Sequence, residues 1–200
     1  MKKLFVFATI ALMAVGVQAQ EVAFGAKAGV NFASLSGDDA EGLDGRTGFH
    51  LGVIADIAIT NRFSIQPEVL YSTRGAKQDN FLFEDEFGDD MTGKVEIKLD
   101  YIDVPVMLKY YVVQGLSLQA GLQFSFNTSS EMEFSDDTDS ITIGMEDETE
   151  SFDIGGAVGL GYDLPMGLFL QGRYTTGFTE IFTDSDIKNN VLQLSIGYKF

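Results

Sequence analysis

Apolar and polar residues alternate with a period of two through most of the chain after residue 20. In 116–127, for example, leucine, alanine and phenylalanine alternate with serine, glutamine, glycine and asparagine. This period places successive side chains on opposite faces of a β-strand. Eight segments follow it, with Phe169 as a mild exception: 24–32, 48–59, 63–74, 102–110, 116–127, 152–162, 168–174 and 192–200.

The apolar stripes have the length of membrane-crossing strands. Most of the segments cover about 9–12 residues, close to the 9–11 that a tilted strand needs to span a bilayer. Alternation alone does not say which face points outward, because a soluble lipocalin-like barrel or a sandwich also alternates, with its apolar face inside.

The less apolar face favours a membrane barrel. It is rich in glycine, alanine and serine and carries charges of both signs in near balance, although the whole chain has a net charge of −17. Small residues and balanced charges suit the narrow lumen of an eight-stranded barrel. The predicted lumen charge network comprises Lys27, Arg74, Lys109, Arg173 and Lys199 with Asp56, Glu68, Asp103 and Asp153.

Aromatic residues point the same way, since several lie at corresponding ends of their strands, as the girdle of an outer-membrane barrel requires. They are Phe63, Tyr110, Tyr162, Tyr198 and Phe200. We therefore expect an all-β fold, an eight-stranded antiparallel up-and-down transmembrane β-barrel. Its apolar face should contact lipid, and a soluble barrel remains the alternative.

Short and long connections alternate along the chain. Short turns at 60–62, 111–115 and 163–167 would face the periplasm, and long loops at about 34–47, 77–93, 128–150 and 179–189 would be extracellular. The long loops hold 22 of the 30 acidic residues. These carboxylates could bind divalent cations that bridge to lipopolysaccharide, or attract a basic partner, or simply solvate the surface.

One strand is expected to rise above the membrane. In 94–100, charged residues (Lys94, Glu96, Lys98) occupy the face that becomes apolar from Ile102 onward. The other face, with Val95, Ile97, Leu99 and Tyr101, should cap the barrel mouth from inside.

The N-terminus has the three parts of a secretory signal. Lys2 and Lys3 precede an uncharged apolar run from residue 4 to 17, and Val17-Gln18-Ala19 offers small residues at the cleavage site. We expect a signal peptide at 1–19 and a barrel domain at 20–200, exported to the periplasm and inserted into the outer membrane. The chain has no cysteine, which excludes disulfides and thiolate metal sites, and no cofactor is expected. So acidic a chain does not suit nucleic-acid binding.

Several motifs resemble the PorT-like outer-membrane β-barrel family of Bacteroidetes. They are 25–29 (GAKAG), 67–72 (PEVLYS), 101–105 (YIDVP), 108–110 (LKY), 172–174 (GRY) and 197–200 (GYKF). The resemblance implies a whole-chain barrel, and Tyr198 and Phe200 are similar to the terminal signal that the barrel-assembly machinery reads. The link of the family's namesake to a secretion apparatus is not transferred to this chain.

Three classes of function remain. A non-catalytic structural or interaction barrel, in contact with outer-membrane lipid and lipopolysaccharide, is the first, and its protein partner is unknown. A narrow pore or a transport or secretion-accessory barrel is the second, although eight strands leave a lumen that side chains fill. A membrane hydrolase is the third, and we expect no enzyme. The only histidine, His50, lies on the lumen face without a Ser-His-carboxylate spacing.

The lumen charges should pair across the barrel. Lys27, Asp56, Glu68 and Arg173 lie about three to five residues from the short-turn ends of their strands, which suggests similar depth. Because a lone charge in a narrow lumen is costly, we expect these four to pair, with Arg173 forking onto Glu68.

Overall fold

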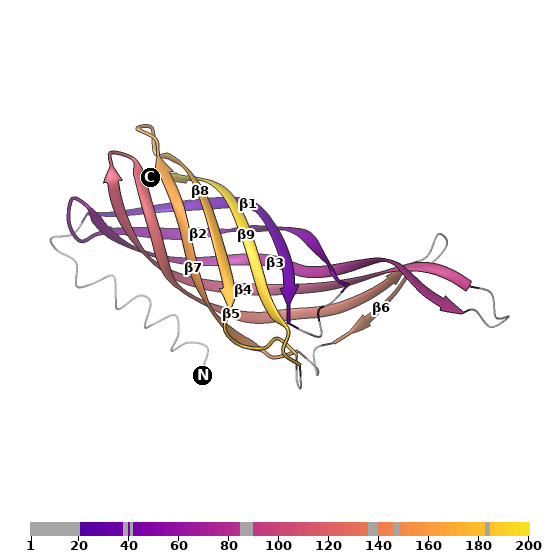
Figure 1. Cartoon of the computed structure of the whole chain (residues 1–200). Helices are drawn as coiled ribbons and strands as arrows, with labels where there is room; N and C mark the ends of the chain where they lie inside the picture. The colour runs from indigo at the N-terminus through magenta and orange to yellow at the C-terminus, as the bar shows by residue number, and fades with distance from the viewer. Residues whose placement is uncertain are drawn as a thin grey trace, which may run out of the picture.

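The computed structural model describes residues 21–37, 40, 42–84, 90–135, 140–145, 149–182 and 185–200. Antiparallel strands form one sheet that rolls into a closed ring (Figure 1). The strands are β1 (Val22–Ser36), β2 (Asp44–Ala58), β3 (Phe63–Glu84), β4 (Asp90–Val113), β5 (Leu116–Ser135), β6 (Ser140–Gly144), β7 (Phe152–Asp163), β8 (Leu168–Gly177) and β9 (Lys188–Lys199). The signal peptide expected at 1–19 lies outside the described residues. In the described ranges no helix is long and apolar enough to cross a membrane.

Eight of the described strands make up the ring, in the order β1, β2, β3, β4, β5, β7, β8, β9. The first and last strands pair in antiparallel register, with Ala28 opposite Ile196, and this pairing closes the ring. β6 pairs only with the outer part of β5 and stands outside the ring. The eight-stranded antiparallel up-and-down barrel predicted from the alternation is therefore confirmed.

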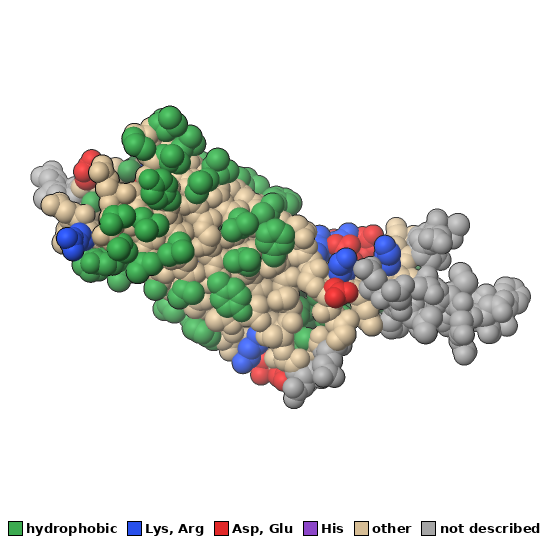
Figure 2. Space-filling view, turned by 45° about the horizontal axis from the view of Figure 1, so that its top comes forward, with side chains coloured by type: hydrophobic (Ala, Val, Ile, Leu, Met, Phe, Trp, Pro, Cys, Tyr) green, Lys and Arg blue, Asp and Glu red, His purple; other side chains and the backbone are tan. Residues whose placement is uncertain are grey.

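The barrel is apolar outside and polar inside. Val53 and Leu122 on the outer face are 59% and 46% exposed, whereas Gln123, the neighbour of Leu122, is 1% exposed. On the face of the barrel seen in Figure 2, apolar side chains form a broad band. Soluble proteins bury such side chains, so this arrangement excludes the soluble-barrel alternative and requires an apolar solvent around the band.

The two ends of the ring differ. The β2–β3, β4–β5 and β7–β8 connections are short and lie at one end, called here the short-turn end. The predicted aromatic girdle lies there, and the rings of Phe63 and Tyr110 are 4.9 Å apart. The opposite end, called the long-loop end, carries the remaining connections.

Two of the predicted long loops are partly strand. β3 and β4 continue through most of 77–93, and β5 and β6 occupy much of 128–150. Strands β3 to β6 therefore extend past the ring and project from the long-loop end (Figure 1). The period of two continues beyond the apolar stripe in these segments, and each strand obtains its backbone hydrogen bonds from its neighbour, so pairing does not stop where the membrane stops.

Candidate functional site

The lumen is filled with polar side chains from the inward positions of all eight ring strands. Eight of the nine predicted lumen charges are buried, and Lys199 is half-buried at the short-turn end. The side chain of His50 is buried in the lumen as well, and it is 1% exposed. These side chains occupy the space that a solute would need.

A three-residue cluster lies at the centre of the lumen. Arg173 of β8 donates two hydrogen bonds to Glu68 of β3, with Nη1–Oε2 and Nη2–Oε1 distances of 3.0 and 2.6 Å. The ammonium group of Lys27 on β1 lies 2.7 Å from Oε2 of the same carboxylate. All three side chains have no exposed surface. Glu68 thus compensates two buried cations, and the fork is the pairing that the alternation predicts.

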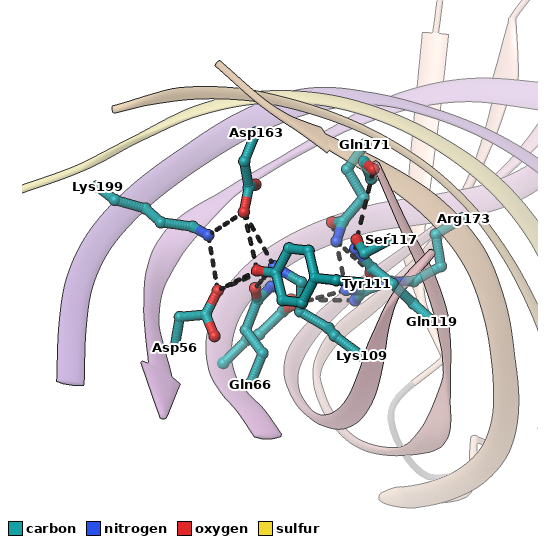
Figure 3. A network of polar contacts seen from close by, with 12 residues as sticks. Asp56, Gln66, Lys109, Tyr111, Ser117, Gln119, Asp163, Gln171, Arg173 and Lys199 are labelled. Carbon is teal, nitrogen blue, oxygen red and sulfur yellow. Dashed lines mark hydrogen bonds and ion pairs between the residues drawn. The ribbon is translucent and has the colours of Figure 1, made fainter. Parts of the chain in front are cut away.

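A second cluster closes the short-turn end (Figure 3). Oδ2 of Asp56 accepts hydrogen bonds from Lys109 at 2.9 Å and from Lys199 at 2.6 Å. Lys199 also binds Asp163 at 2.7 Å, and the hydroxyl of Tyr111 donates to the same Asp163 carboxylate at 2.8 Å. The side chains bridge β2, β4, β7 and β9, so they form a polar plug across the mouth.

Asp56 was expected to pair at the depth of Lys27, Glu68 and Arg173, and this expectation is wrong. In a tilted barrel neighbouring strands are staggered, so counting residues from a strand end does not give depth. Asp163 and Tyr111 were missed because both lie where a strand meets a turn. The inward position of Asp163 at the end of β7 was the signal that could have found it.

Glutamine side chains connect the two clusters. Gln171 accepts a hydrogen bond from Lys27 at 2.8 Å and donates to Gln119 at 2.5 Å. Gln66 accepts from Lys109 at 3.1 Å and donates to Glu68 at 2.7 Å. The polar contacts are therefore continuous from the mouth to the middle of the barrel (Figure 3).

A third group of charges lies nearer the long-loop end. Arg74 of β3 pairs with Asp103 of β4, and its guanidinium carbon is 4.7 Å from the ring centre of Tyr101. Asp153 of β7 accepts a hydrogen bond from Thr179 at 2.5 Å. With Asp163 included, the lumen groups described so far comprise five cations and five carboxylates, so the lumen is neutral although the chain is strongly acidic.

His50 lies between a serine and an asparagine, at hydrogen-bond distances similar to those in a catalytic triad. Its Nε2 is 2.8 Å from Oγ of Ser195 and its Nδ1 is 2.7 Å from Oδ1 of Asn31. Asn31 is fixed in turn, since it donates to Ser72 at 2.9 Å. The four side chains are at most 7% exposed, which leaves no path for a substrate to reach the serine. The arrangement works as a hydrogen-bonded brace between β1, β2, β3 and β9.

An apolar cap closes the long-loop end. Leu99 and Tyr101 of β4 pack there against Ile181 and Ile187, and all four are at most 8% exposed. Ala40 and Ile97 complete the cluster. The sequence predicted that the inward face of 95–101 would cap the mouth, and Ile97, Leu99 and Tyr101 do so.

In the part of the chain that the structure describes, no group of three or more histidine, aspartate or glutamate side chains is arranged to hold a metal ion. The buried carboxylates of Asp56, Glu68 and Asp103 are instead paired with lysine or arginine, and Asp153 accepts a hydrogen bond from Thr179.

Comparison with known proteins agrees with this architecture. The family model described as "outer membrane protein beta-barrel domain" matches residues 18–183, which is most of the chain. A comparison with curated protein sequences finds no significant match.

Solved structures share the fold at low sequence identity. Neisserial surface protein A aligns with a TM-score of 0.56 and 15% identity, covering 90% of this chain and 99% of that one. The attachment invasion locus protein Ail of Yersinia pestis gives 0.54 and 16%, with coverage of 90% and 99%. A major outer membrane protein of Thermus thermophilus gives 0.54 and 15%, with coverage of 90% and 100%. At these identities the likeness concerns the fold.

Proposed function

The chain belongs to the outer membrane protein beta-barrel domain family and resides in the outer membrane, and from this premise we propose that it is a non-catalytic barrel with a closed lumen. Its long-loop end would face outward, for structural or interaction roles. The observation that carries the proposal is the double closure of the lumen. The plug around Asp56 and Lys199 fills one mouth and the cap around Leu99 and Tyr101 fills the other.

The closed lumen argues against a pore. An eight-stranded barrel has an interior that side chains fill, and here the fill includes arginine and lysine held by ion pairs. A solute would have to break these pairs and displace the apolar cap. In planar bilayers the protein should therefore give no stable conductance steps at physiological salt, and reproducible open steps would contradict the proposal.

A hydrolase is disfavoured for a related reason. A serine nucleophile needs substrate access as well as a histidine base. Ser195 and His50 meet the distance requirement but lie inside the lumen, 7% and 1% exposed.

The orientation is supported by the lengths of the connections, because outer-membrane barrels keep short turns in the periplasm. The absence of cysteine gives a clean test, since single cysteines can be introduced one at a time. Ile141→Cys on the exposed strand β6 should react with a membrane-impermeant maleimide on intact cells. Gln114→Cys in the β4–β5 turn should react only after the outer membrane is opened. The reverse pattern would overturn the orientation.

The projecting sheet is the surface we propose for interaction. It carries its charges on the face that continues the lipid face, where Arg46 pairs with Glu96 and Lys98 with Glu133. The surrounding loops add the acidic excess counted in the sequence, which would attract a basic partner or divalent cations. Binding of poly-lysine to the barrel in detergent should weaken steeply with salt, and salt-independent binding or none would favour a merely solvated surface.

Biogenesis follows from the same proposal. Residues 1–19 would direct export, and Tyr198 and Phe200 would be read by the barrel-assembly machinery. Phe200 is 78% exposed at the end of β9, where another protein can reach it. Within the family, the motifs at 67–72 and 101–105 support a PorT-like branch, and the namesake's link to a secretion apparatus is not transferred to this chain.

A further inference from the structure

A polar hollow opens on the outer wall of the barrel, where the apolar band ends. It has a volume of about 420 Å³ and lies over strands β2 to β5. Its lining includes Arg46, Thr73, Lys98, Asp100, Ser129 and Glu131. The hollow is on the lipid side of the wall, because Lys98 and Asp100 share the outward face of β4 with Ile102 and Val106.

Irregular backbone builds the hollow. The register between β2 and β3 shifts between Gly45 and His50, and Arg46, which lies in this irregular segment, lines the hollow. Arg46 then crosses β3 above Gly75, donates to the carbonyl of Arg74 at 2.8 Å, and reaches Glu96 of β4 at 2.5 Å. Gly75 has a φ of +134° and no side chain to obstruct this path.

Two aromatic rings form the membrane side of the hollow. The ring centres of Phe49 and Tyr71 are 5.9 Å apart, and both side chains line the hollow. The Tyr71 hydroxyl donates to Asp100 at 2.6 Å, so the ring is held at the boundary between the apolar band and the first charged row. Aromatic residues at this height mark the membrane–water interface.

The charges in the hollow suit a ligand with both a phosphate and hydroxyl groups. Arg46 and Lys98 supply cationic donors. Arg46 is paired with Glu96 and Lys98 with Glu133, and each cation has further N–H donors that can bind a ligand. The hydrogen bond to Glu133 raises the pKa of Lys98, so the ammonium group stays charged at neutral pH. The carboxylates of Asp100 and Glu131 can accept hydrogen bonds from hydroxyl groups.

We propose that this hollow binds the phosphorylated sugar headgroup of a glycolipid in the leaflet that surrounds the long-loop end. Arg46 and Lys98 hold the phosphate, Asp100 and Glu131 accept from the sugar hydroxyls, and the acyl chains run over Phe49 and Tyr71 onto the apolar band. The membrane position of the hollow favours a lipid over a soluble sugar phosphate, because only a lipid is concentrated at this height. The assignment of the outer leaflet rests on the proposed orientation.

The experiment uses the full mature barrel in detergent micelles, with bound lipid counted by native mass spectrometry. Monophosphoryl lipid A, the same lipid without its phosphate, and phosphatidylglycerol are offered separately, with glucosamine 1-phosphate as a soluble competitor. Monophosphoryl lipid A should bind about tenfold more tightly than either other lipid, which corresponds to one lost charge-assisted contact. The soluble competitor should displace it only in large excess.

Two variants test the site itself. Lys98→Gln removes a phosphate donor and should abolish the preference for the phosphorylated lipid, and Ser129→Trp should block the hollow. Lys188→Gln is the matched control, because β9 lies across the ring from β4, and it should bind as the native protein does. Heat-modifiable migration in gels verifies folding of each variant.

Three results would overturn the inference. They are equal binding of all three lipids, unchanged binding by both folded variants, or displacement by glucosamine 1-phosphate at equal concentration, which would assign a soluble ligand. An error in the proposed orientation can be distinguished from an error in this inference. Maleimide labelling would then give the reverse pattern, while lipid binding in micelles would be unchanged.

Discussion

Arg173 and Glu68 are 105 residues apart in sequence and lie on strands β8 and β3, four strands apart in either direction around the ring of eight, yet they share two hydrogen bonds. The contact spans the lumen and holds opposite walls of the barrel at a fixed distance. Lys27 binds the same carboxylate from β1, so Glu68 is the shared anion of the cluster.

This geometry predicts unequal effects of single substitutions. Glu68→Leu leaves two buried cations unpaired and should cost about 3–5 kcal/mol. Arg173→Leu should cost less, because Lys27 still compensates Glu68. The double variant should be more stable than Glu68→Leu alone, since it removes one of the two unpaired cations.

Urea unfolding of the barrel from lipid vesicles measures these differences as a double-mutant cycle. Strictly additive losses would mean that lumen water solvates each group separately.

The outer face offers a test of lipid contact. Leu122 is 46% exposed and faces the apolar band, so Leu122→Arg should cost roughly 2–4 kcal/mol near mid-bilayer. Leu122→Met is the matched control and should be almost neutral. Gln123 is a poor comparison, because it is fully buried in the filled lumen and an arginine there would be overpacked. Equal stability of the arginine and methionine variants would contradict the assignment of this face to lipid.

Sequence alternation predicted which side chains point inward and allowed the fork of Arg173 onto Glu68 to be anticipated, but it could not predict the other pairs. The period of two assigns Lys27, Glu68 and Arg173 to the lumen without knowledge of the strand order. Pairing depends on the stagger between strands, which is why Asp56 joins Lys109 and Lys199 instead. The brace between His50 and Ser195 was missed for the same reason, since β9, which carries Ser195, becomes a neighbour of β1 only when the ring closes.

The hydrogen-bonded brace around His50 should contribute to stability and should have no nucleophilic reactivity. Ser195→Ala leaves Nε2 of the histidine without a partner in a closed lumen, which should cost about 1–3 kcal/mol of unfolding free energy. Because no substrate can reach the serine, a fluorophosphonate probe should not label the folded protein. Labelling that disappears in Ser195→Ala would instead show an accessible nucleophile and revive the hydrolase alternative.

The C-terminal residue should matter for assembly more than for stability. The backbone N–H of Phe200 donates to the carbonyl of Phe24 at 2.9 Å, and its ring is 78% exposed, so it contributes little packing within the barrel. Deletion of Phe200 should reduce the amount of heat-modifiable barrel in the outer-membrane fraction and leave export to the periplasm unchanged. Phe200→Tyr, which keeps an aromatic terminus, should behave as the native chain, and an unaffected deletion would argue against a signal role.

The pairing of β1 with β9 has a consequence for the order of events during biogenesis. One edge of the first strand has to wait for β9, which is the last strand of the ring to be synthesised. Until then the protein carries an unpaired, aggregation-prone edge, and a long loop must close before that edge gains any hydrogen bond. The fork between β8 and β3 and the contacts of Lys199 depend on the same late step. A partly synthesised barrel would therefore lack both the β1–β9 pairing and the ion pairs of the lumen. We expect the nascent chain to need protection by periplasmic chaperones until its final strand is available.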